Sequence, residues 1–174
     1  MASIRKVKIP DGVKVKLEGS QLSITGPKGQ LVRNVRFPQV TITFDNNEII
    51  ISTESSRKEI IAMVGTIEAH AKNMCRGVTE GYEYRMKVVY SHFPIQLKLQ
   101  GQKLEIANFL GEKKARYASI HDGVTAKVAN DEVILTGIDR ELVWNSAANI
   151  EHATRIRNRD PRVFQDGIYM VQRG

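Results

Sequence analysis

Apolar and polar residues alternate with a period of two in several stretches of the first half of the chain. Residues 13–17 alternate in this way, a Gly-Ser turn follows, and residues 22–24 resume the pattern. Residues 40–44 and 48–53 repeat it around a second turn. Because successive side chains of a strand point to opposite faces of a sheet, this alternation predicts two β-hairpins, each with one exposed face.

From residue 56 the pattern changes to helical spacing. Ser56 and Glu59 have the capping-box spacing that opens helices, and Gly77 suits the end of one. Between them, apolar residues recur three or four positions apart, at Ile60, Val64, Ile67, Ala71 and Met74. Residues 78–89 return to a strand pattern. This part of the chain therefore predicts a helix followed by a long strand.

The hydrophobic pattern then occurs a second time. Residues 13–24 match residues 95–106 in their apolar positions, a lysine and a glycine, at an offset of 82. Residues 48–50 (EII) match residues 132–134 (EVI) at an offset of 84. A recurrence of this length exceeds the ~20–50 residues of solenoid repeats and has the size of a small domain. The pattern indicates two copies of one module.

The second copy predicts the same succession of elements as the first. Its strands alternate again, Asp139 or Thr136 can cap its helix, and residues 168–171 predict a closing strand. We therefore predict an α+β fold of two tandem duplicated modules, each a mostly antiparallel sheet packed against one helix. The expected boundaries are residues 1–90 for the first module and residues 91–174 for the second.

Charge adds a class of partner to this picture. The 174 residues include 26 Lys+Arg against 19 Asp+Glu, a net charge of +7, which suits a polyanion such as nucleic acid. The alternative is a soluble protein that happens to be basic. A single cysteine excludes an intramolecular disulfide and indicates a reducing compartment. With neither a long apolar run nor a signal-peptide core, we expect a cytoplasmic protein with no membrane partner.

Motifs for catalysis are missing from the sequence. It contains neither the Gly-x-x-x-x-Gly-Lys phosphate loop nor the Gly-x-Ser-x-Gly elbow, and its histidines have no metal-ligand spacing. Cys75 lies near Lys72 and Arg76, which would lower the pKa of its thiol; the alternative, which we adopt, is a small packing residue. We expect no enzyme activity, no cofactor and no metal site.

Eight basic residues are the candidates for contact with RNA. Three lie in a loop of the second copy and four follow its helix, where helical spacing would place several on one side if the helix extends that far. The alternative for the latter group is an ordinary solvated helix end. The eighth, Lys28, lies within residues 26–29 (GPKG). This segment resembles the Gly-x-x-Gly loop of KH domains, but strands flank it, so we interpret it as a turn. The candidates are Lys113, Lys114, Arg116, Arg155, Arg157, Arg159, Arg162 and Lys28.

Aromatic residues make up only 6% of the chain, and those in strand-like stretches are expected to pack in the core. The sequence therefore shows no aromatic platform for single-stranded bases. Folded RNA, held by its shape and its phosphates, is the expected target.

Four segments resemble the large-subunit ribosomal protein L6 family in its archaeal and eukaryotic form: residues 77–95 (GVTEGYEYRMKVVYSHFPI), 108–113 (NFLGEK), 139–150 (DRELVWNSAANI) and 159–169 (RDPRVFQDGIY). The resemblance covers essentially the whole chain, from about Pro10 to Gly174. The bacterial form has a Lys/Gly-rich stretch near its end where this chain has residues 164–168 (FQDGI), so contacts of those lysines are not transferred. The end at Gly174 favours an archaeal source.

The resemblance implies a duplicated structural protein of the cytoplasmic ribosome that supports translation and catalyses nothing. It implies large-subunit rRNA as partner, near the sarcin–ricin loop and beside the region where translational GTPases dock, with other large-subunit proteins as neighbours. In the family the C-terminal module carries much of the RNA contact. The main RNA-binding surface is therefore expected in residues 91–174, on the basic loop and on the arginines after the second helix.

Two other classes of function remain open at the level of sequence. One is an RNA-processing enzyme on a duplicated scaffold, for which Asp139 and Glu141 are candidates by residue type only. The other is a protein–protein adaptor whose positive charge is incidental.

Overall fold

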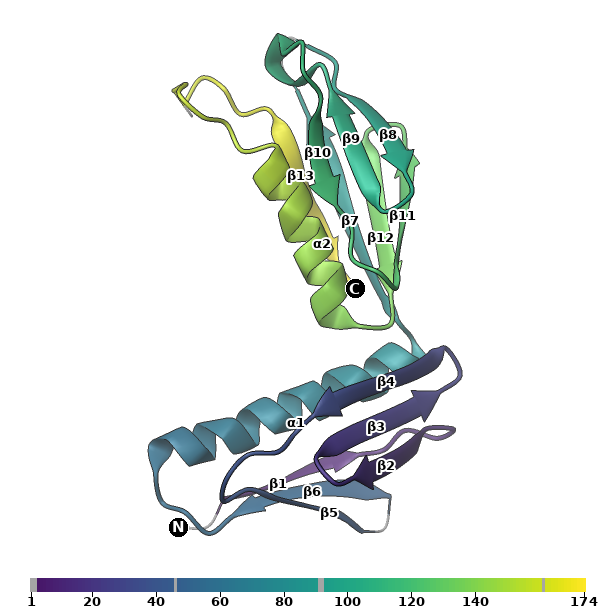
Figure 1. The fold of residues 1–174 in the computed structure, drawn as a ribbon, viewed down its shortest axis with the longest axis vertical. Coiled ribbons are helices and arrows are strands. Elements are labelled where there is room, and N and C mark those ends of the chain that lie inside the picture. Colours follow the sequence, from purple (N-terminus) through teal and green to yellow (C-terminus); the bar gives the residue numbers. More distant parts are fainter. Residues whose placement is uncertain (1–2, 46, 91–92, 161) are drawn as a thin grey trace. The chain divides into compact units, whose positions relative to one another are not determined.

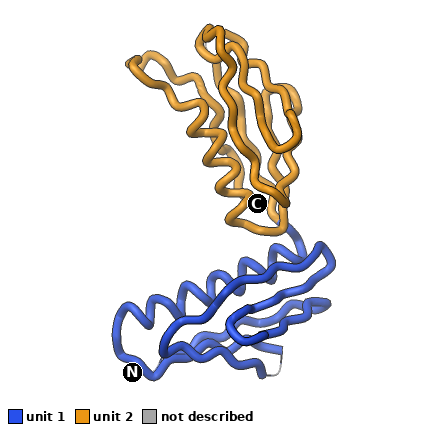
Figure 2. The backbone as a smooth tube through the Cα atoms, viewed as in Figure 1, with its two compact units in different colours: residues 1–81 blue, residues 82–174 orange. Residues whose placement is uncertain are grey.

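Figure 1 shows the fold in a computed structural model that describes residues 3–45, 47–90, 93–160 and 162–174. The chain divides into two compact units, residues 1–81 and 82–174, coloured separately in Figure 2. Each unit has its own hydrophobic core, so each is described by itself.

The first unit packs one long helix against two antiparallel three-stranded sheets, ordered β1-β6-β5 and β2-β3-β4. The helix contacts β1, β3, β4 and β6. The core of this unit contains aliphatic side chains from both sheets and from the helix, among them Leu22, Ile24, Ile49, Ile51, Val64 and Ile67. The elements are β1 (Ser3–Lys8), β2 (Lys14–Glu18), β3 (Gln21–Gly26), β4 (Gly29–Asn34), β5 (Thr41–Asp45), β6 (Glu48–Thr53) and α1 (Lys58–Thr79).

Both ends of α1 differ from the sequence prediction. The capping box at Ser56 is wrong, because the N-cap is Arg57 and no side chain caps the helix there. The helix also continues past Gly77 to Thr79. Gly81 follows the C-cap residue Glu80 and terminates the helix. Its φ of +74° is the left-handed conformation that glycine adopts most easily, and its N–H donates to the Arg76 carbonyl at 3.3 Å.

The second unit repeats this plan with one additional strand. A four-stranded sheet, β11-β12-β7-β13, and a three-stranded sheet, β10-β9-β8, are both antiparallel, and α2 packs against β7, β10, β12 and β13. Its elements are β7 (Tyr82–Val89), β8 (Gln96–Gln100), β9 (Lys103–Ala107), the 3₁₀ turn η1 (Phe109–Gly111), β10 (Arg116–Ser119), β11 (Val124–Ala129), β12 (Glu132–Gly137), α2 (Arg140–Ala153) and β13 (Gly167–Arg173). The predicted fold class is thus confirmed, with each unit dividing its strands between two sheets.

The strand assigned to the end of the first module belongs to the second unit. Strand β7 pairs with β12 and β13, and Met86 faces Val133 in register. In the first unit Val7 of β1 faces Ile49, the repeat partner of Val133. Strand β1, which the sequence prediction missed, is therefore the counterpart of β7. Compact packing places the boundary after Gly81 instead of after residue 90, because β7 opens the second copy.

Candidate nucleic-acid interface

A loop present only in the second unit holds two of the candidate lysines. In the first unit β3 and β4 are joined by the two-residue turn Pro27-Lys28, whereas β9 and β10 are separated by η1 and a bend. Phe109 and Leu110 of η1 are buried and anchor this loop in the core. Lys113 and Lys114 follow in the bend, and both are exposed.

Arg116 is buried more deeply than an RNA-contacting residue is expected to be, with its side chain 22% exposed. Its Nε and Nη2 donate to both carboxylate oxygens of Glu112, at 2.8 and 2.5 Å. Its Nη1 donates to the backbone carbonyls of Ala153 and Arg155, each at 3.0 Å. The guanidinium carbon lies 4.3 Å from the centre of the Phe109 ring. Arg116 thus joins the basic loop to the end of α2.

Glu112 is the acidic partner that holds this arginine. The hydrogen bond from Arg116 is the main cause that lowers the pKa of Glu112; partial burial opposes it, and the charges of Arg116 and Arg159 add to it. The effect of Arg159 shows that a second candidate arginine lies near the same carboxylate. Two basic segments about 40 residues apart in the sequence are therefore neighbours in the fold.

The arginine-rich segment after α2 is irregular rather than helical. Helix α2 begins as predicted, with Asp139 Oδ1 accepting the Glu141 N–H at 2.8 Å. It ends at Ala153, so the condition under which Arg155, Arg159 and Arg162 would share one helix face is not met. A longer helix would bond the Ala153 carbonyl to a backbone N–H four residues on, and the Arg116 side chain takes that place.

The arginines of this segment are available to a partner. Arg155, Arg157, Arg159 and Arg162 are all exposed. Arg159 lies over the Phe164 ring, with its guanidinium carbon 4.9 Å from the ring centre. Within the described residues, no acidic side chain forms an ion pair with these four arginines or with Lys113 and Lys114. In the first unit, by contrast, Arg5 and Lys72 both pair with Glu68.

Local clustering, rather than net charge, distinguishes the second unit. Residues 1–81 hold 12 basic and 8 acidic residues, and residues 82–174 hold 14 and 11. The two units are therefore almost equally basic. What differs is that six exposed cations of the second unit gather on two adjoining segments and form no ion pair among the described residues.

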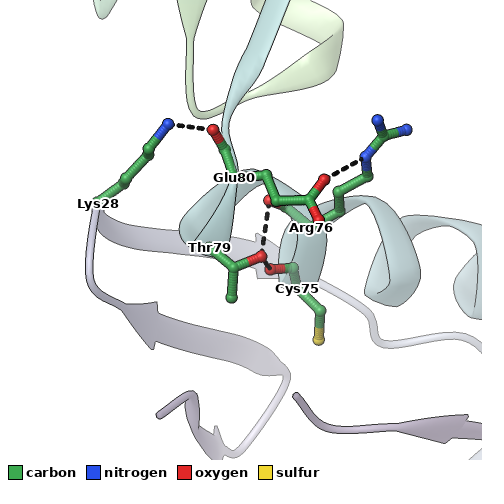
Figure 3. A network of polar contacts seen from close by, with 5 residues as sticks. All are labelled: Lys28, Cys75, Arg76, Thr79 and Glu80. Carbon is green, nitrogen blue, oxygen red and sulfur yellow. Dashed lines mark hydrogen bonds and ion pairs between the residues drawn. The ribbon is translucent and has the colours of Figure 1, made fainter. Parts of the chain in front are cut away.

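Lys28 is the candidate that the structure does not group with the others. Its backbone N–H donates to the Val78 carbonyl at 2.9 Å, and its ammonium donates to the Glu80 carbonyl (Figure 3). The turn that holds Lys28 thus caps the end of α1.

Cys75 lies in the last turns of the same helix. In Figure 3 the Thr79 hydroxyl donates to the Cys75 carbonyl. Burial raises the pKa of the Cys75 thiol, which favours its interpretation as a packing residue.

A hollow of about 320 Å³ lies where β10 meets the end of α2. Its lining residues come from β10, the last turn of α2 and the arginine segment: Arg116, Tyr117, His152, Ala153, Arg155 and Arg157. Tyr117, His152 and Glu112 belong to this site but were not predicted from the sequence. The available signals were an acidic residue four positions before Arg116 and an aromatic residue that ends a basic run.

The profile of the ribosomal protein L6 family matches the chain twice, at residues 9–81 and 93–167. The chain belongs to this family. The two matches cover most of both units and confirm the internal duplication. The L6 family is one of structural ribosomal proteins, not of enzymes. The interpretation of Asp139 as a helix cap agrees with this, whereas a role in RNA processing does not.

Relatives similar along their whole length carry the name large ribosomal subunit protein uL6. The protein of Methanospirillum hungatei is 57% identical over 169 residues, which cover 97% of this chain and 96% of that one. That of Methanothrix thermoacetophila is 50% identical over 170 residues, covering 98% and 97%. That of Methanobrevibacter smithii is 43% identical over 173 residues, covering 99% and 97%. These archaeal relatives agree with the resemblance to the archaeal form.

Neither α1 nor α2 combines the length and apolar character that a membrane span requires. Side chains of His, Cys, Asp and Glu form no group of three or more that would hold a metal ion in the part of the chain that the structure describes.

Proposed function

We propose that this chain is a structural component of the large subunit of the cytoplasmic ribosome and that it binds large-subunit rRNA through the second unit. The family and its uL6 relatives support the assignment to the subunit. The observation that supports the RNA contact is the junction made by Arg116, which joins the basic loop to the arginine segment. Exposed cations without acidic partners attract phosphates, since binding them releases condensed counterions.

Seven of the eight candidates fall into two roles in this interface. Lys113, Lys114, Arg155, Arg157, Arg159 and Arg162 contact phosphates directly. Arg116 positions the two segments, because its guanidinium is already engaged by Glu112 and by two carbonyls. Lys28 serves the first unit as a helix cap. The first unit offers surface to neighbouring ribosomal proteins.

The location on the ribosome is the finer part of the proposal. We place the second unit against the sarcin–ricin region of the rRNA, beside the site where translational GTPases dock. Chemical footprinting of large-subunit rRNA with and without the protein tests this placement. Protection of the sarcin–ricin region is expected, and protection confined to other parts of the rRNA would contradict it.

The adaptor alternative predicts a different response to nuclease. If rRNA is the partner, the cosedimentation of this chain with large subunits is lost once the accessible RNA is digested. Cosedimentation that survives digestion would favour contact with proteins and would contradict the RNA-binding proposal.

A further inference from the structure

The hollow between β10 and α2 has the size and the charge of a site for one nucleotide. Its volume of about 320 Å³ lies at the small end of the ~300–1,000 Å³ range of ligand sites, which excludes a base-paired helix. Its charged lining residues, Arg116, Arg155 and Arg157, are all cationic. An anion of the size of a phosphate therefore meets no acidic side chain in the lining.

The end of a helix usually repels an anion, because its last carbonyls are unsatisfied and carry the negative end of the helix dipole. Here those carbonyls are engaged. The Ala153 and Arg155 carbonyls accept from Arg116, and the His152 carbonyl accepts the Arg155 N–H at 3.2 Å. Arg116 thus offsets the negative end of the α2 dipole at one wall of the hollow. Arg155 and Arg157 form no ion pairs among the described residues and can bind a phosphate.

Tyr117 adds a flat apolar surface to the cationic walls. It belongs to the lining of the hollow and is 58% exposed, and because side chains alternate along β10 it points outward while Arg116 lies against the core. In the first unit the equivalent position holds Val32, since Val32 faces Ser23 and Tyr117 faces Glu105, the repeat partner of Ser23. An aromatic ring beside arginines is the combination that binds an unpaired nucleotide, with the base stacked and the phosphate neutralised.

We propose that this hollow binds one unpaired nucleotide of the rRNA, with its base stacked on Tyr117 and its phosphate held by Arg155 and Arg157. The inference rests on the proposed RNA-binding function and deepens it. It adds one base-stacking contact to a surface that otherwise recognises RNA through its phosphates alone.

Three variants of the full chain separate stacking from charge. The first, Tyr117→Val, places in the second unit the residue that the first unit has at this position. The second, Tyr117→Phe, keeps the ring. The third, Arg155→Gln with Arg157→Gln, removes the two cations. Affinity for protein-free archaeal large-subunit rRNA is measured at several salt concentrations, and thermal melting verifies that each variant is folded.

Stacking and phosphate contacts respond differently to salt. For Tyr117→Val we expect about tenfold weaker binding at every salt concentration, with an unchanged slope of log affinity against log salt. Tyr117→Phe is expected to bind like the natural chain. The arginine pair is expected to reduce the magnitude of the slope by roughly 0.7, the value for one single-strand phosphate contact.

Two results would overturn the subsite. If Tyr117→Val binds as tightly as the natural chain, or if Tyr117→Phe is as weak as Tyr117→Val, no base stacks on this ring. Neither result would affect RNA binding by the rest of the surface. If the natural chain itself does not bind rRNA, the proposed function fails instead, so the two failures are distinguishable.

Discussion

Arg116 shows how one substitution separates the two copies. It faces Ile106 across the β9–β10 pair, whereas Leu31 faces Ile24, the repeat partner of Ile106, in the first unit. Leu31 packs against the first core, and Arg116 instead lies over Phe109 and donates to the end of α2. A half-buried arginine is tolerated at a position that holds an apolar residue in the first unit, because its N–H groups are hydrogen-bonded within the protein.

Glu112→Gln is predicted to weaken rRNA binding by severalfold. Considered as charge alone, the removal of an acid from a basic surface should strengthen binding. The opposite sign is expected because Glu112 holds the arginine that joins the two segments. Filter binding at constant salt measures the effect, with Glu105→Gln on the neighbouring strand β9 as the matched control. Tighter binding by Glu112→Gln would show that Arg116 contacts RNA directly.

The same carboxylate predicts a dependence of stability on pH. A carboxyl group whose pKa is lower in the folded protein contributes stability above its unfolded pKa of about 4.3, and that contribution is lost as pH falls through the folded value. Because the pKa of Glu112 is lowered, the natural chain should melt at a higher temperature than Glu112→Gln near pH 7, and the gap should close in acid. A gap that widens below pH 4 would contradict this account.

At the scale of elements, the divergence of the copies is concentrated where α2 stops. Helix α1 has 22 residues and α2 has 14. The positions that continue α1 as a helix correspond in the second copy to the arginine segment, which leads into β13. The hydrophobic pattern predicted both helices, since buried residues recur at helical spacing in each. The pattern of the second helix reaches Ala153, where α2 ends, but it left open a continuation into the arginine segment. The group that takes over the Ala153 carbonyl is a side chain from β10, which no local pattern reveals.

The packing of α1 on the turn after β3 gives a test by substitution. A Cβ on Gly26 would lie 2.7 Å from Val78 Cγ2 and 2.8 Å from the Val78 carbonyl oxygen, so Gly26→Ala forces a shift of backbone. We expect a loss of about 1–3 kcal/mol in the free energy of unfolding. The control is Gly65→Ala in α1, where the Cβ meets nothing within 4 Å and a gain of about 0.5–1 kcal/mol is expected. Denaturant titration measures both; equal effects would contradict the close approach.

At the scale of the whole molecule, the repeat predicted two units but misplaced the strand between them. Alternation identifies β7 as a strand, yet no local pattern states which sheet a strand joins, and β7 follows α1 directly in the chain. Its partners, β12 and β13, come 40 or more residues later in the sequence. The basic residues give a similar result. The sequence showed each of the two basic clusters, but it did not show that Arg116 joins them.

Two fragments test this boundary. The fragment of residues 82–174 keeps β7 and is expected to fold and to bind rRNA. The fragment of residues 91–174 lacks the strand that pairs with both β12 and β13, so it is expected to stay unfolded. Circular dichroism and thermal melting compare them. Equal, cooperative melting of both fragments would show that β7 is dispensable to the second unit.

The central claim is that two basic segments form one RNA-binding surface, and the salt dependence of rRNA affinity tests it most directly. The pairs Lys113→Gln/Lys114→Gln and Arg155→Gln/Arg159→Gln each neutralise one segment. A third pair, Lys98→Gln/Lys127→Gln, neutralises exposed lysines of β8 and β11, the sheet edges opposite β10 and β13. Each of the first two pairs is predicted to reduce the slope by roughly 1.4–1.8, and the third to leave it unchanged. An unchanged slope for either of the first two, or an equal loss for the third, would contradict the account.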